Sequence, residues 1–223
     1  MSHIRQAIRA QIKLWLRKGV YSSYSQGGED LLVAGLLSEI KKGTYIDVGT
    51  YHPIQYSNTY FLYKKGWSGL VIDPNPQLKR LYRFFRPRDQ FVNVGVGEVE
   101  GEYEYTEFSD GAFNTFDSQE AEARKKQEYP KFLGTKLLPL KTLATIVKDY
   151  GITEIDFMSI DVEGLDIQVL KSHNWKIPPK VIVIEDNTLE IEKFQESAAY
   201  QFLHPAGYTL MAAAARTLVF KRK

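Results

Sequence analysis

Acidic side chains lie at the ends of four short apolar runs in this chain. Asp47 belongs to the run at 45–48, Asp73 follows the run at 70–72, and Asp161 and the acidic group at 185–187 end two later runs. Such runs are typical of buried parallel strands, whose ligands bind beyond their carboxyl ends. We therefore expect these acids at one edge of a sheet, facing a ligand.

The first two acids suit a nucleoside. Asp73 follows Asp47 by 26 residues, a spacing at which a carboxylate can accept both hydroxyls of a ribose, and Gly49 lets the backbone approach a ligand closely. This stretch has no G-x-G-x-x-G motif to bind a pyrophosphate, which disfavours NAD and FAD and favours S-adenosylmethionine. The alternative is that both acids merely cap strand ends in an α/β protein of unrelated function.

The later acids suit a cation. Asp161, Asp186 and Asn187 supply oxygen ligands of the kind that Mg²⁺ prefers, and a bound metal would lower the pKa of a substrate hydroxyl. Alternatively, one acid is a metal-free general base and the others cap helices. His52 would titrate near neutral pH if unperturbed, so it is a further candidate for the base, or else a structural donor.

Other polar residues fall where they could reach a cofactor or substrate. Gln26 and Asp30 lie in YSQGGED, at the predicted start of a helix, and Asn114 lies in the loop SDGAFNTF. Asn75 stands between two prolines after Asp73, and Ser57 precedes the next helix. We predict all five among the cofactor-binding residues, although helix capping or a simple turn explains several of them as well.

The elements that position these residues follow from the hydrophobic pattern. Runs at 45–48 and 70–72 enclose one predicted helix that packs Tyr56 and Tyr60 on the sheet and stops at Gly66. The helix after Pro76 is expected to bury four apolar residues and expose its cations. Those four are Leu78, Leu81, Tyr82 and Phe85.

The middle and the end of the chain predict further elements. Residues 91–96 predict a third strand, followed by a hairpin that turns at Gly101. The polar segment 117–136 predicts an exposed helix, ended by Pro130, that forms a lid over the acceptor site. Apolar runs at 155–161 and 181–185 predict two parallel strands. The last two apolar runs, at 207–212 and 217–221, predict an antiparallel pair that closes the sheet.

Composition bounds the class of protein. A chain of 223 residues without cysteine suits one α/β domain and excludes disulfides and thiolate chemistry. Residues 1–20 carry five cations and no acid, so residues 1–23 predict a basic amphipathic helix ahead of a single domain at 24–223. Packing on that domain or in a homo-oligomer is favoured over contact with a membrane. The net charge of the chain after residue 20 disfavours a nucleic-acid partner. No segment resembles a signal peptide or a membrane span, and we therefore expect the protein in the cytoplasm.

Several separate blocks of sequence, in order, resemble the FkbM-type family of S-adenosylmethionine-dependent methyltransferases. The resemblance runs from Tyr24 to the end of the chain. Its blocks are YSQGGED (24–30), YIDVGTYHP (45–53), YSNTYFLYKKGWSGLVIDPNP (56–76), RPRD (86–89), FNTFD (113–117), IDFMSIDVEGLDIQVLKSHNW (155–175) and VIVIE (181–185).

The resemblance implies a doubly wound, Rossmann-like sheet of seven mostly parallel strands, with the last strand antiparallel and helices on both faces. It implies methyl transfer to a hydroxyl of a sugar, glycan or natural product. Asp47 and Gly49 would then form the first cofactor loop, Asp73 would bind ribose, and Asp161 and Glu163 would lie beside the reacting methyl. The alternative is a catalytically inactive relative that only binds, which the acids at 161, 163 and 185–187 disfavour.

Two features go beyond the family pattern. Thr50 and Tyr51 replace smaller residues after the first glycine. Asp186 and Asn187 resemble the metal-binding pair of catechol-type O-methyltransferases, but Gly164 stands where those enzymes carry a lysine base. The base is therefore expected to be His52, Glu163 or a metal-bound hydroxide.

Overall fold

A computed structural model describes residues 21–214 and 216–223. The basic helix predicted at 1–23 lies almost wholly outside the described residues, and residues 21–23 have no regular secondary structure. No helix within the described ranges is both long and apolar enough to cross a membrane.

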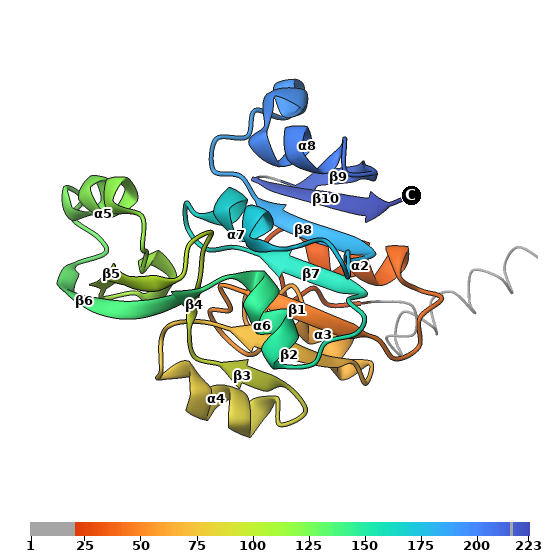
Figure 1. Cartoon of the computed structure of the whole chain (residues 1–223), viewed down its shortest axis with the longest axis horizontal. Helices are drawn as coiled ribbons and strands as arrows, with labels where there is room; N and C mark the ends of the chain where they lie inside the picture. Colours follow the sequence, from red (N-terminus) through yellow and green to blue (C-terminus); the bar gives the residue numbers. More distant parts are fainter. Residues whose placement is uncertain (1–20, 215) are drawn as a thin grey trace, which may run out of the picture.

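The centre of the fold is a seven-stranded sheet in the order β3-β2-β1-β7-β8-β10-β9 (Figure 1). The strands are β1 Thr44–Val48, β2 Ser68–Ile72, β3 Gln90–Val92, β7 Phe157–Ile160, β8 Val181–Glu185, β9 Tyr208–Ala214 and β10 Thr217–Arg222. The pairs from β3 to β8 are parallel, and β10 runs antiparallel to both of its neighbours. The predicted mostly parallel sheet with an antiparallel last strand is confirmed.

Helices cover both faces of this sheet. The α-helices are α2 Glu29–Leu36, α3 Tyr60–Lys64, α4 Leu78–Phe85, α5 Ser118–Lys125, α6 Leu143–Asp149, α7 Asp166–Ser172 and α8 Ala198–Leu203. Short 3₁₀ helices form at η1 Gly111–Phe113 and η2 Ile191–Glu196.

Two hydrophobic cores result, one on each face, because side chains alternate along a strand. In β8, Ile182 and Ile184 join the core that contains α6, α7 and α8, whereas Val181 and Val183 join the core that contains α2, α3 and α4. All four side chains are at most 1% exposed. Near-continuous apolar strands of this kind are typical of a sheet buried on both sides.

A second, three-stranded sheet projects from this body and was not predicted. It contains β4 Gly95–Val96, β5 Gly101–Phe108 and β6 Phe132–Lys141, with β6 between the other two. Figure 1 shows β5, β6 and α5 extending together to one side of the main sheet. The predicted third strand at 91–96 is thus two strands, β3 and β4, in different sheets.

Three local predictions were wrong. The hairpin through Gly101 does not form, because β5 pairs antiparallel with the distant β6. Between β1 and β2 the helix is only α3, and Tyr56 lies outside it at φ 57° with 53% of its surface exposed. On α4, Leu78 and Tyr82 are buried as predicted, but Leu81 is 38% exposed and Phe85 43% exposed.

The strand order places a binding cleft at β1 and β7. The chain proceeds from β1 to β2 and β3 in one direction, and from β7 to β8 in the other. Connections leave the adjacent ends of β1 and β7 on opposite faces, which opens a crevice there. Val48 and Ile160, the last residues of these strands, are paired in the sheet.

Candidate active site

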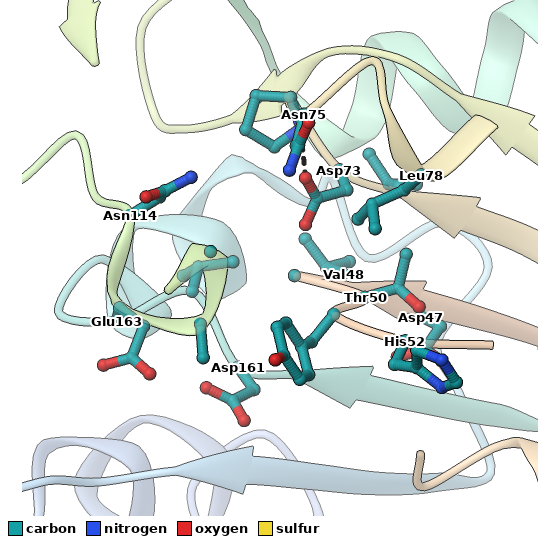
Figure 2. Close-up of a pocket in the computed structure, with 18 of the residues that line it drawn as sticks. Asp47, Val48, Thr50, His52, Asp73, Asn75, Leu78, Asn114, Asp161 and Glu163 are labelled. Atoms are coloured by element: carbon teal, nitrogen blue, oxygen red, sulfur yellow. Dashed lines mark hydrogen bonds between the residues drawn. The ribbon is translucent and has the colours of Figure 1, made fainter. Parts of the chain in front are cut away.

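A cavity of about 500 Å³ opens at the carboxyl ends of β1, β2 and β7. Figure 2 shows Asp73 and Asn75 on one side of it and Asp161 and Glu163 on another. The volume falls within the range of roughly 300–1,000 Å³ that is usual for sites that bind small molecules. Of the acids that the sequence placed at strand ends, Asp47, Asp73 and Asp161 line this cavity, whereas the acidic group at 185–187 is not among its lining residues.

Asp73 directly follows β2 and offers a carboxylate to this cavity. One of its oxygens, Oδ1, accepts a hydrogen bond from the backbone N–H of Asn75 at 2.7 Å. The second oxygen receives no hydrogen bond from the described residues. Burial raises the pKa of Asp73 to about 8, because the charged form loses solvation. A ribose diol is a donor that would replace that lost solvation.

Gly49 directly follows β1 and has a backbone conformation that other residues avoid. Its φ is 82°, and its N–H donates to the carbonyl of Ile72 at 3.0 Å. A Cβ at this position would lie 1.6 Å from the carbonyl oxygen of Asp161. Glycine is therefore required for the turns after β1 and β7 to pass one another beside the cavity.

Asp47 is anchored from beneath the cavity. Its carboxylate accepts a hydrogen bond from the Thr59 hydroxyl at 2.5 Å, and that hydroxyl also accepts from Nη2 of Arg86 at 2.9 Å. The Arg86 side chain is completely buried, and its Nε donates to Asp89 at 2.6 Å. Burial raises the pKa of Asp47, while the positive charge of Arg86 acts in the opposite direction.

The same guanidinium also fixes the loop after Gly49. Its Nη1 donates to the carbonyl of Pro53 at 3.4 Å and to the Ser57 hydroxyl at 3.2 Å. Nη2 donates in addition to the Tyr45 hydroxyl at 2.9 Å. The RPRD motif did not predict this role, since these three hydroxyl partners of Arg86 lie 27 to 41 residues earlier in the chain.

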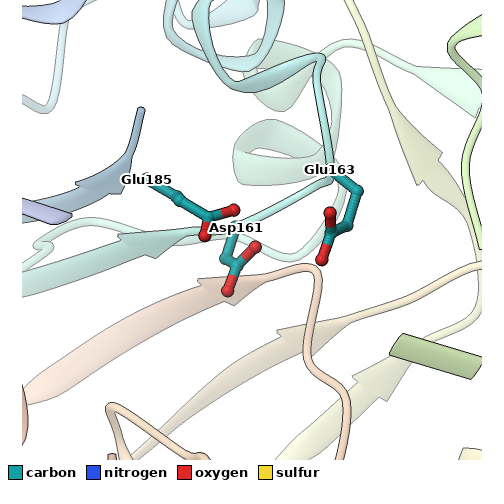
Figure 3. A group of neighbouring side chains, drawn as sticks. All are labelled: Asp161, Glu163 and Glu185. Carbon is teal, nitrogen blue, oxygen red and sulfur yellow. The ribbon is translucent and has the colours of Figure 1, made fainter. Parts of the chain in front are cut away.

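Two carboxylates, Asp161 and Glu163, line the other end of the cavity, and a third, Glu185, lies beside them. Asp161 follows β7, Glu163 lies in the next turn and Glu185 ends β8, and ligand atoms of the three lie within 4.8 Å of one another. Figure 3 shows Asp161 between the other two. Burial, together with the charges of Glu185, Glu163 and Asp166, raises the pKa of Asp161 well above its usual range. We call these residues the acid trio.

The comparisons with known proteins agree with this geometry. A family model described as the methyltransferase FkbM domain matches residues 47–210, which include Gly49, Asp73 and the whole acid trio. The chain belongs to the FkbM methyltransferase family. Membership in this family implies methylation that depends on S-adenosylmethionine.

Two other comparisons give no evidence about the function of the chain. No curated protein matches the chain. Among solved structures, the chain is similar to a TehB-like SAM-dependent methyltransferase from Corynebacterium glutamicum ATCC 13032 Kitasato, with 13% identity and a TM-score of 0.41 over 98% of this chain and 97% of that chain.

The residues of this FkbM protein fit S-adenosylmethionine. Asp73 presents an unpaired carboxylate oxygen for ribose, and Leu78, Val94 and Val96 line the same cavity with apolar surface that suits the faces of an adenine. The cavity then continues to the acid trio without a cluster of cations for phosphate among its lining residues. This donor set matches a nucleoside that lacks phosphates better than NAD or FAD.

The helix predicted at 117–136 and ended by Pro130 is shorter than expected, because α5 ends at Lys125 and β6 begins at Phe132. The segment that contains α5 is tied to the acid trio. Arg124 of α5 donates to Oε2 of Glu163 at 2.5 Å and to the carbonyl of Phe113 at 2.7 Å. The Thr115 hydroxyl donates to the carbonyl of Glu163 at 2.9 Å. The Glu163 backbone lies in the left-handed region, with φ 56°. Glu163 therefore joins the segment that contains α5 to the turn after β7.

Replacing Arg124 by glutamine should loosen this segment without unfolding the sheet. We expect amide hydrogen exchange in residues 109–131 to become faster by on the order of tenfold, since a partly buried charged hydrogen bond contributes roughly 1.5–3 kcal/mol. Exchange in β1 and β8 should stay unchanged. Lys125→Gln is the matched control because Lys125 pairs with the exposed Glu122. Equal exchange in both variants would show that Arg124 does not hold the segment.

His52 is engaged within its own turn. Its Nδ1 accepts hydrogen bonds from the backbone N–H groups of Ile54 and Gln55, at 3.1 and 2.9 Å. The neutral ring then carries its proton on Nε2, so it has no free lone pair to accept another. Burial also lowers the pKa of His52. This geometry favours a structural acceptor over the predicted general base.

The other predicted cofactor residues divide into two groups. Gln26, Ser57, Asn75 and Asn114 line the cavity. Ser57 and Asn114 also stabilise the cavity wall. The Asn114 side-chain oxygen accepts a hydrogen bond from the N–H of Phe108 at 2.8 Å, and the Ser57 hydroxyl accepts one from Arg86. Asp30 is fully buried outside the lining and accepts hydrogen bonds from residues 23–25, so it fixes the approach to α2.

Of the three predicted metal ligands, only Asp161 belongs to the acid trio. The carboxylate of Asp186 instead accepts two hydrogen bonds from Thr188. The side-chain oxygen of Asn187 accepts from Arg216 at 3.1 Å. The acid beside Asp161 is thus Glu185, which the sequence showed only as part of a group.

Asn58, which lines the cavity and donates to Ser159 at 3.0 Å, was missed because nothing in its sequence context distinguishes it.

Proposed function

We propose that this protein is an S-adenosylmethionine-dependent O-methyltransferase that methylates a hydroxyl of a sugar, glycan or natural-product acceptor. The observation that carries the proposal is that Asp73, Asp161 and Glu163 line one cavity, with Glu185 beside the last two. One end can bind the ribose of the cofactor, and the other can bind an acceptor and take its proton.

The bound cofactor supplies a methyl group that its sulfonium already activates. The residues of the chain therefore have to hold two partners in line and remove a proton. Asp73 accepts hydrogen bonds from the ribose, and Gly49 leaves room for the backbone around it. Asp161 lies between two other acids, and this position makes it the proton acceptor that we favour over His52.

A hydroxyl acceptor suits this arrangement. Alcohols are weak nucleophiles and gain from a carboxylate that accepts their proton as the bond to the methyl forms. Glu163 is paired with Arg124, so its charge is partly compensated, whereas no cation of the described residues forms an ion pair with Asp161. This difference supports Asp161 rather than Glu163 as the base.

The proposal is tested in two steps. Isothermal titration should show that S-adenosylhomocysteine binds, and the absence of heat at millimolar ligand would leave the inactive relative as the better explanation. Radiolabel from the methyl group should then enter hydroxyl-containing acceptors as an ether that resists mild alkali. Label released by alkali as methanol would indicate a carboxyl ester, and label on nitrogen would also contradict the proposal.

The predicted magnesium ion is a separate question. Three carboxylates within 4.8 Å offer oxygen ligands, but Glu163 is already bound to Arg124. If Mg²⁺ binds there, EDTA should lower methyl transfer and added Mg²⁺ should restore it, and Glu185→Gln should remove that response. Equal transfer rates with EDTA and with Mg²⁺ would exclude a metal-dependent reaction.

A further inference from the structure

The exposed face of α4 combines aromatic and basic side chains. Phe84 is 77% exposed, Phe85 is 43% exposed, and their rings contact each other edge to face at 4.9 Å. Leu81, which is 38% exposed, continues this apolar strip to the cavity, whose wall it also forms. Exposed apolar patches on a soluble domain often mark a contact surface.

Cations border this strip on the same helix. Residues 77–88 carry five cations and no acid. Of these, Arg86 is buried and Arg88 packs on the Tyr63 ring, which leaves Lys79, Arg80 and Arg83 exposed to solvent. None of these three forms an ion pair with a described residue, and residues 1–20 contain no acid that could supply one. We call Lys79–Phe85, without the buried Tyr82, the α4 face.

We propose that the α4 face docks this protein on an anionic lipid surface. The phenylalanines would enter the interface between headgroups and acyl chains, and the three cations would contact lipid phosphates. Because Leu81 belongs to both the face and the cavity wall, docking brings the cavity to the membrane surface. An acceptor carried on a lipid would then reach it without leaving the bilayer.

The charge pattern favours lipid over other partners. A duplex nucleic acid would be bound by the cations but would leave the exposed phenylalanines without a partner, because its bases are stacked inside the helix. A second copy of the chain, bound symmetrically through the same face, would bring two sets of unpaired cations together. An anionic bilayer complements both the charge and the apolar strip.

Sedimentation of the full chain with vesicles tests the proposal. We expect binding to vesicles of equal parts phosphatidylglycerol and phosphatidylcholine, little binding to pure phosphatidylcholine, and release at 0.5 M salt. Lys79→Gln/Arg80→Gln/Arg83→Gln should lower the partition constant at least tenfold, and Phe84→Ser/Phe85→Ser at least fivefold. Unchanged circular dichroism and melting temperature would show that both variants are folded.

Matched controls come from other exposed surfaces. Lys148→Gln/Lys171→Gln/Lys176→Gln removes three exposed cations, and Leu137→Ser/Met211→Ser removes two exposed apolar side chains. Both should bind vesicles within twofold of the unmodified chain. If the α4 variants also bind within twofold, the face is not the lipid contact and residues outside it are.

Three further outcomes would overturn the proposal. The first is no binding of the full chain to either kind of vesicle. The second is binding of a single-stranded oligonucleotide that is lost in the cation variant and kept in the phenylalanine variant. The third is a dimer, measured by analytical ultracentrifugation, that Phe84→Ser/Phe85→Ser dissociates. Vesicle binding is measured without cofactor or acceptor, so its failure leaves the proposed methyl transfer untouched.

Discussion

Asp73→Asn should weaken the binding of S-adenosylhomocysteine by a factor of about 100 or more. Two hydrogen bonds from ribose hydroxyls to a carboxylate contribute roughly 1.5–3 kcal/mol each, and asparagine offers one neutral acceptor in place of two charged ones. Titration calorimetry measures the affinity. An affinity within threefold of the unmodified chain would show that Asp73 does not bind the ribose.

The same variant should be more stable than the unmodified protein at high pH. The folded-state pKa of Asp73 is raised to about 8, above its unfolded value, so the folded state binds the proton more tightly. The contribution of this group to the free energy of unfolding therefore falls as pH rises from about 4 to about 8. Asparagine has no such dependence. The gain in melting temperature should be smallest at pH 5 and largest at pH 9.

The affinity of the unmodified chain for the cofactor should increase with pH, whereas the contribution of Asp73 to stability falls. Ionised Asp73 accepts two hydroxyl hydrogens, whereas the protonated form has a reduced capacity to accept. Binding of S-adenosylhomocysteine should therefore tighten as pH rises through about 8. The Asp73→Asn variant should lose this dependence, and a dependence retained in the variant would assign it to another group.

Arg86→Met should lower the free energy of unfolding by about 3–5 kcal/mol, the usual cost of removing one partner from a buried ion pair. Asp89 would lose the guanidinium at 2.6 Å, and the hydroxyls of Tyr45 and Thr59 would lose a donor. Urea denaturation measures the change. Arg83→Met, on the exposed side of α4 shortly before Arg86, should change it by less than about 0.5 kcal/mol.

A second variant separates charge from packing at this position. If the cost arises from the unpaired Asp89, the double variant Arg86→Met/Asp89→Asn should be less destabilised than the sum of the two single variants. Strict additivity would contradict the assignment. Arg86 also supports the cavity wall, because it donates to the Ser57 hydroxyl directly and to the Thr59 hydroxyl that binds Asp47.

The sequence predicted the parts of the fold that are continuous in the chain. β1, β2, β7 and β8 are nearly unbroken apolar runs, and a strand buried on both faces admits little else. The acids at their ends could be assigned to one edge because parallel strands share a direction. Asp47, Asp73 and Asp161 line one cavity for this reason.

Features set by distant partners could not be predicted in this way. Tyr103 of β5 pairs with Leu138 of β6, and no short-range signal in either segment names the other. Gly101 therefore suggested a hairpin that the structure lacks. Leu81 and Phe85 fit a buried helical face by spacing, but α4 lies beside the edge strand β3, where the sheet ends and only part of that face is covered.

The position of β10 constrains the order in which the molecule can be built. This strand, which follows the other described strands in sequence, lies inside the sheet between β8 and β9 rather than at its edge. During synthesis, β9 has no partner until residues 217–222 have left the ribosome. Glu185, which pairs with Thr217, gains its second neighbouring strand only at that moment. The end of the cavity that contains Asp161 should therefore become rigid only after residues 217–222 have been synthesised.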